Sequence, residues 1–279
     1  MSTKGKDTME PGFAASEIDT SKPHPARMYD AFLGGRDNYP VDREAVRRML
    51  RDFPEARAIA RANRAFLQRA VRFLAGQAGV RQFLDIGTGI PSAGNVHEVA
   101  GQVSPDSRVV YVDNDPIVHV HANALLTGSG TTSIVLADLR DPKAILAHLR
   151  VRGLIDFGQP VALLLVAILH FIRDDEDPAG IVATLRDALP PGSYLALSHG
   201  TGDFHPASGA DLAATAYRNA TAPLILRTRE RVSRFLDGFD LVDPGLVQAP
   251  LWHPDGKPPR PRDLAKIGIY AGVGCKAGS

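Results

Sequence analysis

Acidic residues and glycines follow one apolar segment of the sequence in an order that suits ligand binding. Asp85, Gly87 and Gly89 lie directly at the end of this segment. Because glycine carries no Cβ atom, a turn built on Gly87 and Gly89 lets a ligand approach the backbone closely. A carboxylate before such a turn favours a ligand with an ammonium or sulfonium charge over a pyrophosphate, and Ser92 stands where a dinucleotide-binding turn has its third glycine. A tight turn that binds no ligand is the alternative interpretation.

Two further acidic residues, Asp113 and Asp138, come at the ends of the next two apolar segments. In a nucleotide-binding sheet, an acid at the end of the second strand can accept both hydroxyls of a ribose. Asp138 is placed to bind the exocyclic amine of an adenine, with Leu139 packed against the ring. Acids at such positions also cap helices, which is our interpretation of Asp115 and the alternative for the loop around Asp141.

The elements that must position these residues alternate between strands and helices. Apolar runs bounded by turn residues predict seven strands, at residues 81–86, 108–113, 132–138, 161–169, 194–199, 240–247 and 266–274. Helical patterns separate most of them, which indicates right-handed βαβ units and a mostly parallel sheet. The run 161–169 is apolar throughout, as in a central strand buried on both faces. Because a proline-rich loop joins the last two strands in place of a helix, we expect an antiparallel last strand.

These elements predict one α/β domain, a three-layer sandwich with a helical N-terminal extension. Residues 1–17 are polar, have little to bury and predict a disordered leader. Residues 18–80 form the extension and residues 81–279 form the core. Apolar residues at spacings of three and four predict the helices of the extension, at 25–33, 42–51 and 56–75.

The first predicted helix carries more polar and aromatic side chains than a packing helix needs. Arg27, Tyr29 and Asp30 fall within one helical turn, and Gly34 and Gly35 end the helix. We interpret this segment as a lid over a ligand, with the two glycines as its hinge. Arg27 would bind a carboxylate, and Tyr29 would cover apolar surface while its hydroxyl stays hydrogen-bonded. A helix that only packs is the alternative.

Composition and charge exclude several classes of protein. The 32 Lys and Arg residues oppose 31 Asp and Glu residues, so no global field recruits nucleic acid or anionic lipid. Cys275 is the single cysteine, which excludes an internal disulfide and cysteine-rich metal sites, and the histidines lack metal-ligand spacing. No apolar run is long enough to span a bilayer and no signal peptide is recognised, so we expect a cytoplasmic protein. A local arginine cluster keeps a nucleic-acid partner as an alternative: Arg227, Arg229, Arg231 and Arg234.

The successive motifs resemble those of class I S-adenosylmethionine-dependent methyltransferases. They are Asp85-Ile86-Gly87-Thr88-Gly89, then Asp113, then Asp138-Leu139. Over roughly residues 18–275 the chain is also similar to a bacterial methyltransferase family, found mainly in actinomycetes and formerly known as a domain of unknown function. The stretches that carry this second resemblance are 25–30, 33–38, 62–67, 82–91, 95–98 and 109–116.

The resemblance implies a Rossmann-like fold and S-adenosylmethionine as cofactor. Asp85 and the glycines beside it would hold the methionine end of the cofactor, Asp113 the ribose and Asp138 the adenine. Pro91 stands where the class often has a further glycine, which makes the turn stiffer. The residues implied in cofactor binding are Arg27, Tyr29, Asp85, Gly87, Thr88, Gly89, Asp113, Asn114, Asp138 and Leu139.

The expected function is methyl transfer to a small-molecule acceptor, which the sequence does not identify. His170, which follows the apolar run 161–169, and Tyr29 are the candidate catalytic residues; a structural role is the alternative for His170. Two other functions stay open. One is a non-catalytic protein that binds S-adenosylmethionine, such as a regulator, and the other is an NAD(P)-dependent oxidoreductase. The sequence predicts no oligomeric state.

Overall fold

A computed structural model describes residues 19–278, apart from 127–129, 206–211, 213 and 258. The predicted leader, residues 1–17, lies outside the described residues. Within the described part of the chain, no helix is long and apolar enough to cross a membrane.

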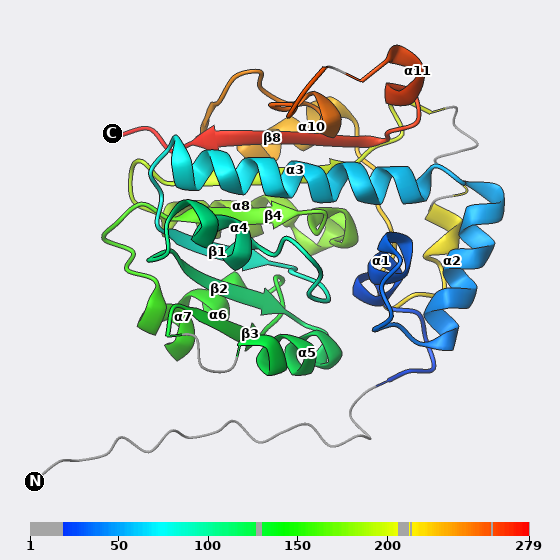
Figure 1. The fold of residues 1–279 in the computed structure, drawn as a ribbon, viewed down its shortest axis with the longest axis horizontal. Helices are drawn as coiled ribbons and strands as arrows, with labels where there is room; N and C mark the ends of the chain where they lie inside the picture. The colour runs from blue at the N-terminus through cyan, green and yellow to red at the C-terminus, as the bar shows by residue number, and fades with distance from the viewer. Residues whose placement is uncertain (1–18, 127–129, 206–211, 213, 258, 279) are drawn as a thin grey trace, which may run out of the picture.

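One twisted sheet runs through the molecule (Figure 1). Its strands follow the spatial order β3-β2-β1-β4-β5-β8-β6, and β7 also pairs with β8. β1 to β5 are parallel, whereas β8 is antiparallel to β5, β6 and β7. The strands are β1 (Gln82–Ile86), β2 (Arg108–Asp113), β3 (Thr132–Leu136), β4 (Ala162–Val166), β5 (Tyr194–Gly200), β6 (Asp240–Leu241), β7 (Val247–Gln248) and β8 (Ile269–Cys275). The strand order reverses between β1 and β4, where sheets of this type bind ligands.

The described sheet has eight strands, one more than the sequence predicts. The segment 240–247 forms two short strands, β6 and β7, instead of one. Pro244 has no N–H group to donate to a ladder, and Gly245 turns the chain at a φ of 83°. Both short strands pair with β8, so the prediction of an antiparallel last strand is confirmed.

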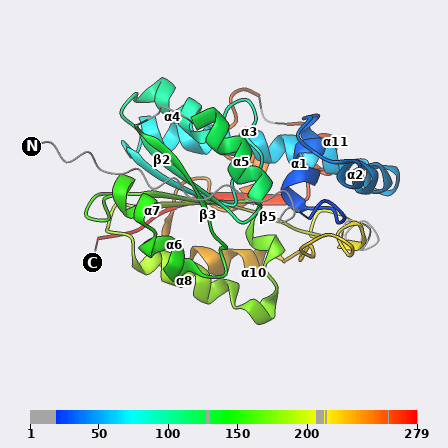
Figure 2. The ribbon, with the colours of Figure 1, turned by 90° about the horizontal axis from the view of Figure 1, so that it is seen from below.

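Helices cover both faces of the sheet and complete the three layers (Figure 2). One face carries α3 (Ala56–Gly76), α4 (Val96–Val103) and α5 (Pro116–Leu126); the other carries α6 (Pro142–Ala147), α7 (Leu149–Leu154), α8 (Pro178–Asp187) and α10 (Arg229–Ser233). A short helix, α11 (Pro261–Leu264), precedes β8. Each face buries its own apolar core because the side chains of a strand alternate between the two faces of the sheet.

The predicted extension, 18–80, consists of two different parts. α3 packs directly on the sheet, with Phe66 and Leu74 in the same core as Phe83. In contrast, α1 (Pro25–Leu33) and α2 (Pro40–Asp52) lie beyond the carboxyl ends of the parallel strands (Figure 1). They pack with the start of α3 and with Tyr217 in a third, smaller core. Gly34 ends α1 in the left-handed conformation, as predicted.

Candidate functional site

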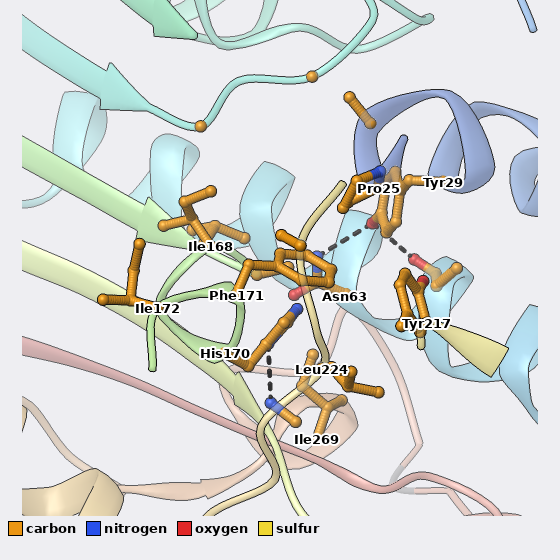
Figure 3. A pocket seen from close by; sticks show the side chains of 18 of the residues that line it. Pro25, Tyr29, Asn63, Ile168, His170, Phe171, Ile172, Tyr217, Leu224 and Ile269 are labelled. Carbon is orange, nitrogen blue, oxygen red and sulfur yellow. Dashed lines mark hydrogen bonds between the residues drawn. The ribbon is translucent and has the colours of Figure 1, made fainter. Parts of the chain in front are cut away.

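A cavity of about 260 Å³ lies at the carboxyl ends of the parallel strands, under α1 (Figure 3). Its polar half follows β1, β2 and β3 and is completed from α3: Arg64, Asp85, Gly87, Thr88, Gly89, Asp113, Asn114, Asp138, Leu139 and Arg140. Its apolar half comes from α1 to α3, from the segments after β4 and β5, and from β8: Phe32, Met49, Phe53, Ile59, His170, Phe171, Ile172, Thr201, His205, Tyr217, Thr221, Leu224, Leu226 and Ile269. The two halves therefore meet at the point where the strand order reverses.

The turn after β1 requires both of its glycines. Gly87 and Gly89 have φ values of 78° and 67°, a region that L side chains rarely adopt. A Cβ atom at Gly87 would also lie 2.5 Å from Cγ1 of Ile168, which follows β4. The tight turn is thus fixed both by backbone conformation and by a side chain that packs against it.

Asp113 fastens this turn to the end of β2. Its carboxylate accepts hydrogen bonds from the backbone N–H groups of Gly89, at 2.8 Å, and Asp115, at 2.9 Å. Each carboxylate oxygen has a second lone pair, so Asp113 can still accept from a ligand. Asp115 caps α5 as predicted, because its Oδ1 accepts from the N–H group of Ile117.

Two buried carboxyl groups of the polar half have raised pKa values. Burial raises the pKa of Asp85 to about 7, against the opposing effects of the Arg64 guanidinium and a hydrogen bond with Thr88. Burial raises the pKa of Asp113 to about 6, even though backbone N–H groups stabilise its charged form. Groups that lose hydration in this way gain stabilisation from a ligand cation or hydroxyl.

Asp138 and Asn114 lie together at the rim of the polar half. Asn114 Nδ2 donates to Asp138 Oδ2 over 3.0 Å, which ties the segment after β2 to the segment after β3. Arg140 contacts the same carboxylate at 3.2 Å and reaches Glu176 at 2.7 Å. Leu139 is buried beside them and lines the cavity. The structure brings these predicted residues together.

Arg27, a predicted cofactor residue, does not line the cavity. Its buried guanidinium lies 3.3 Å from Asp115 Oδ2 and 3.9 Å from Asp42 Oδ2, so it joins α1 to the starts of α2 and α5. The residues that the sequence placed beside it on α1 are separated by the helical twist. Tyr29 faces the cavity, and Asp30 instead bonds Asn38.

Arg64 lines the cavity, although the sequence analysis did not single it out. Its Nη2 donates to Asn95 Oδ1 over 3.0 Å and to the carbonyl of Ser92 over 3.1 Å. Its Nε is buried and has no hydrogen-bond partner among the described residues. Arg64 lies in the stretch 62–67, which carries part of the family resemblance. That resemblance was the signal that could have identified it.

Tyr29 lines the cavity, but both hydrogen-bonding functions of its hydroxyl are already engaged. It donates to the carbonyl of Ala60 over 3.0 Å and accepts from Asn63 Nδ2 over 3.0 Å. Burial raises the pKa of Tyr29. Asn63 in turn accepts from Ser198 Oγ on β5 and also lines the cavity. Tyr29 is therefore built to hold α1 in place, and its geometry does not support a role as a base.

His170 lines the apolar half and is bonded on one side only. Its Nδ1 accepts from the backbone N–H group of Gly200 over 3.1 Å. Burial, together with the Arg227 guanidinium, lowers the pKa of His170 to about 3. Beside it, Ala167, the residue after β4, has a φ of 58°, and its N–H group donates to Ser198 Oγ. Non-glycine residues in this region are strained and cluster at functional sites.

The arginine cluster after residue 226 is not a free basic patch. Arg227 is buried and donates to the carbonyls of Leu169 and Ile172. Arg231 pairs with Asp174, Arg234 pairs with Glu230, and Arg229 bonds the carbonyl of Leu246. The described residues contain no group of three or more His, Cys, Asp or Glu side chains that could hold a metal ion.

The polar half fits a ligand that carries an ammonium group, a carboxylate and a ribose. The Asp85 carboxyl offers a cation site, the unpartnered Arg64 Nε offers an anion site, and Asp113 offers free lone pairs to hydroxyls. All three line one cavity.

Comparisons with known proteins agree with this description. A protein of Streptomyces avermitilis MA-4680 from the DUF574 family is 46% identical, with 93% of this chain and 99% of that chain covered and a TM-score of 0.89. A proposed methyltransferase of Thermobifida fusca YX is 43% identical, with 94% and 98% covered and a TM-score of 0.88. An O-methyltransferase family protein of Burkholderia thailandensis is 15% identical, with 80% and 60% covered and a TM-score of 0.51, and shares the fold.

A search of curated proteins found no match. A family model for S-adenosyl methyltransferases matches residues 11–277, almost the whole chain. The predicted cofactor and the predicted fold class are confirmed by this match and by the solved relatives. By its sequence and its fold, the chain belongs to the S-adenosyl methyltransferase family.

Proposed function

We propose that this methyltransferase acts on a small molecule bound in the apolar half of the cavity. The observation that carries the proposal is that the polar and apolar halves form one cavity. Arg227 is buried, and Arg231 and Arg234 pair with carboxylates, which also argues against a nucleic-acid acceptor.

The residues of the polar half are proposed to bind S-adenosylmethionine by chemical complementarity. Asp85 would accept from the ammonium group, Arg64 would donate to the carboxylate and Asp113 would accept from the ribose hydroxyls. The turn at Gly87, Thr88 and Gly89 would lie along the methionine end. The remaining contacts would be to the adenine, from Asn114, Asp138 and Leu139.

When bound, the cofactor supplies a methyl group on a sulfonium, which is already a strong electrophile. The protein's task is then to align the acceptor with that methyl group and to exclude water. Ala167 and Ile168, which follow β4, line the cavity, and Ile168 packs against the turn at Gly87. The family assignment decides against the oxidoreductase hypothesis.

We also propose that α1 and the segment that follows it form the lid of the site. His24, Pro25, Ala26 and Tyr29 line the cavity, and the Ala26 side chain lies 4.0 Å from the position of a Cβ atom at Gly89. Saturating S-adenosylhomocysteine should therefore slow amide hydrogen exchange across residues 24–38. Exchange at the same rate with and without it would mean that α1 only packs.

The proposed function is tested by turnover with a panel of small acceptors. The protein is incubated with S-adenosylmethionine and neutral phenols, alcohols and amines, and release of S-adenosylhomocysteine is measured together with the mass of the product. We expect a gain of one methyl group on a panel member. Methylation of added protein or nucleic acid, with none of the panel, would contradict the proposal, and tight cofactor binding without any turnover would favour a regulatory protein.

A further inference from the structure

The side chain of His170 is held so that one ring nitrogen faces the cavity. Its Nδ1 lies 3.1 Å from the backbone nitrogen of Gly200, at the end of β5. Figure 3 shows the second ring nitrogen on the opposite side of the ring, turned toward the space between Asn63 and Phe171. The ring is fixed edge-on to Phe171 and His199, with centroid distances of 4.5 and 5.5 Å.

The bond to Gly200 decides which nitrogen of His170 carries the proton. A backbone N–H group can only donate, so Nδ1 must be the unprotonated nitrogen of the ring. The proton of the neutral imidazole is then on Nε2, the nitrogen that faces the cavity. A second proton would have to enter between Nδ1 and the N–H group of Gly200, where it has no acceptor.

The charged groups around the ring reinforce this state. Arg227 lies behind it and donates to the carbonyl of Leu169 and to His199 Nε2. His199 is itself kept neutral, since burial lowers its pKa. Across the cavity stand Tyr29 and Tyr217, whose pKa values burial raises. Among the described residues, no carboxylate forms an ion pair with His170 that would stabilise a protonated imidazole.

The apolar half also carries the polar groups of Thr201, His205, Tyr217 and Thr221, but it surrounds His170 mainly with apolar side chains. None of its described lining residues is Lys, Arg, Asp or Glu, because the five charged residues of these types that line the cavity, Arg64, Asp85, Asp113, Asp138 and Arg140, belong to the polar half. Phe171, Leu224 and Ile269 lie around His170 in Figure 3. A charged acceptor would lose its hydration here without gaining an oppositely charged partner.

We propose that His170 is a specificity-determining hydrogen-bond donor, and that the methyl acceptor is an uncharged, apolar or aromatic molecule with an oxygen or nitrogen lone pair directed at Nε2–H. This inference rests on the proposed function. It replaces the expectation that His170 is a general base, since its only unprotonated nitrogen is occupied by Gly200. His170 takes up no proton during methyl transfer. The proton that a hydroxyl or amine acceptor loses on methylation goes to solvent water.

Two aromatic probes of matched shape test the donor. Acetophenone has a carbonyl oxygen where α-methylstyrene has a methylene group. With the full chain saturated by S-adenosylhomocysteine, we expect acetophenone to bind at least about tenfold more tightly, equivalent to about 1.4 kcal/mol. His170→Phe should remove that difference and His170→Gln, whose amide nitrogen can donate from a similar position, should retain part of it. Benzoate and benzylammonium should bind more weakly than acetophenone.

Nitrogen NMR of histidine-labelled protein gives a readout that needs no variant. We expect His170 to show a protonated Nε2 and an unprotonated Nδ1 throughout pH 5–8, and acetophenone to shift the Nε2–H signal. Equal affinity for the two probes, no binding of either, tighter binding of a charged probe, or a ring that titrates in that range would each overturn the proposal. Affinity for S-adenosylhomocysteine and turnover are measured separately. They show whether the proposed function also fails when the His170 proposal fails.

Discussion

The two halves of the cavity are built in different ways. The polar half takes most of its residues from the few positions that follow β1, β2 and β3, so the parallel register of the strands brings them together. The apolar half collects side chains from α1 to α3, from the segments after β4 and β5, and from β8. Charge is confined to the first half and absent from the described lining of the second. The proposed cofactor site is thus a local arrangement at the strand ends, whereas the proposed acceptor site depends on packing across the whole fold.

The most damaging change to the polar half should be Gly87→Val. The new side chain would meet Ile168 and would force an unfavourable φ, so we expect binding of S-adenosylhomocysteine to be lost and the thermal transition to fall. Calorimetric titration and thermal unfolding measure the two effects. Gly101→Val is the matched control, since a Cβ atom there meets nothing within 4 Å. Retained binding would show that the cofactor does not approach this turn.

Asp113→Ala should have the next largest effect on the polar half. It removes the acceptor of the Gly89 N–H group as well as the proposed partner of the ribose. We expect the binding free energy of S-adenosylhomocysteine to weaken by about 1.5–3 kcal/mol, roughly one to two powers of ten in affinity. Asp106→Ala, an exposed carboxylate at the other end of β2, should change nothing. Unchanged affinity in Asp113→Ala would remove the ribose assignment.

A lower pH should weaken cofactor binding in the polar half through protonation of Asp85. Since burial raises its pKa to about 7, its ionised fraction falls between pH 8 and pH 6, and affinity for the ammonium-bearing S-adenosylhomocysteine should fall by about tenfold. Because the folded state favours the protonated form of Asp85, this residue also contributes to the stability of the fold. The contribution is fully present below about pH 4 and is lost as the pH rises through about 7. Calorimetry across this range is the measurement. Asp85→Asn should bind weakly with a flat pH profile, and an equal slope in the variant would assign the effect to another group.

A substitution in the apolar half should change acceptor binding without changing the affinity for the cofactor. Leu224→Asp places a carboxylate in the apolar half, so acetophenone binding should be lost, while the affinity for S-adenosylhomocysteine should stay within about twofold. Leu241→Asp, at an exposed position of β6, should alter neither affinity. A large loss of cofactor affinity in Leu224→Asp would show that the halves do not act separately.

The same difference explains what the sequence predicts well and what it does not. Asp85 and Asp113 are recognisable because each stands at the carboxyl end of a strand, and parallel strands end at one edge. Arg27 and Arg64 both lie on helices ahead of the sheet, and only the packing of α1 and α3 decides that the first contacts Asp115 and the second enters the cavity. The protonation state of His170 depends on Gly200, a residue far along the chain. The spacing of residues along the sequence does not reveal such contacts between distant segments.

The left-handed backbone of Ala167 lowers the stability of the fold, and natural selection can act on that cost. A left-handed non-glycine residue costs roughly 1–3 kcal/mol, and glycine would relieve most of this cost while making the unfolded chain more flexible. Selection for heat resistance alone would favour glycine at this position, so an alanine that is retained here points to a demand other than stability. The residue found here in a relative would therefore record which demand its enzyme has met.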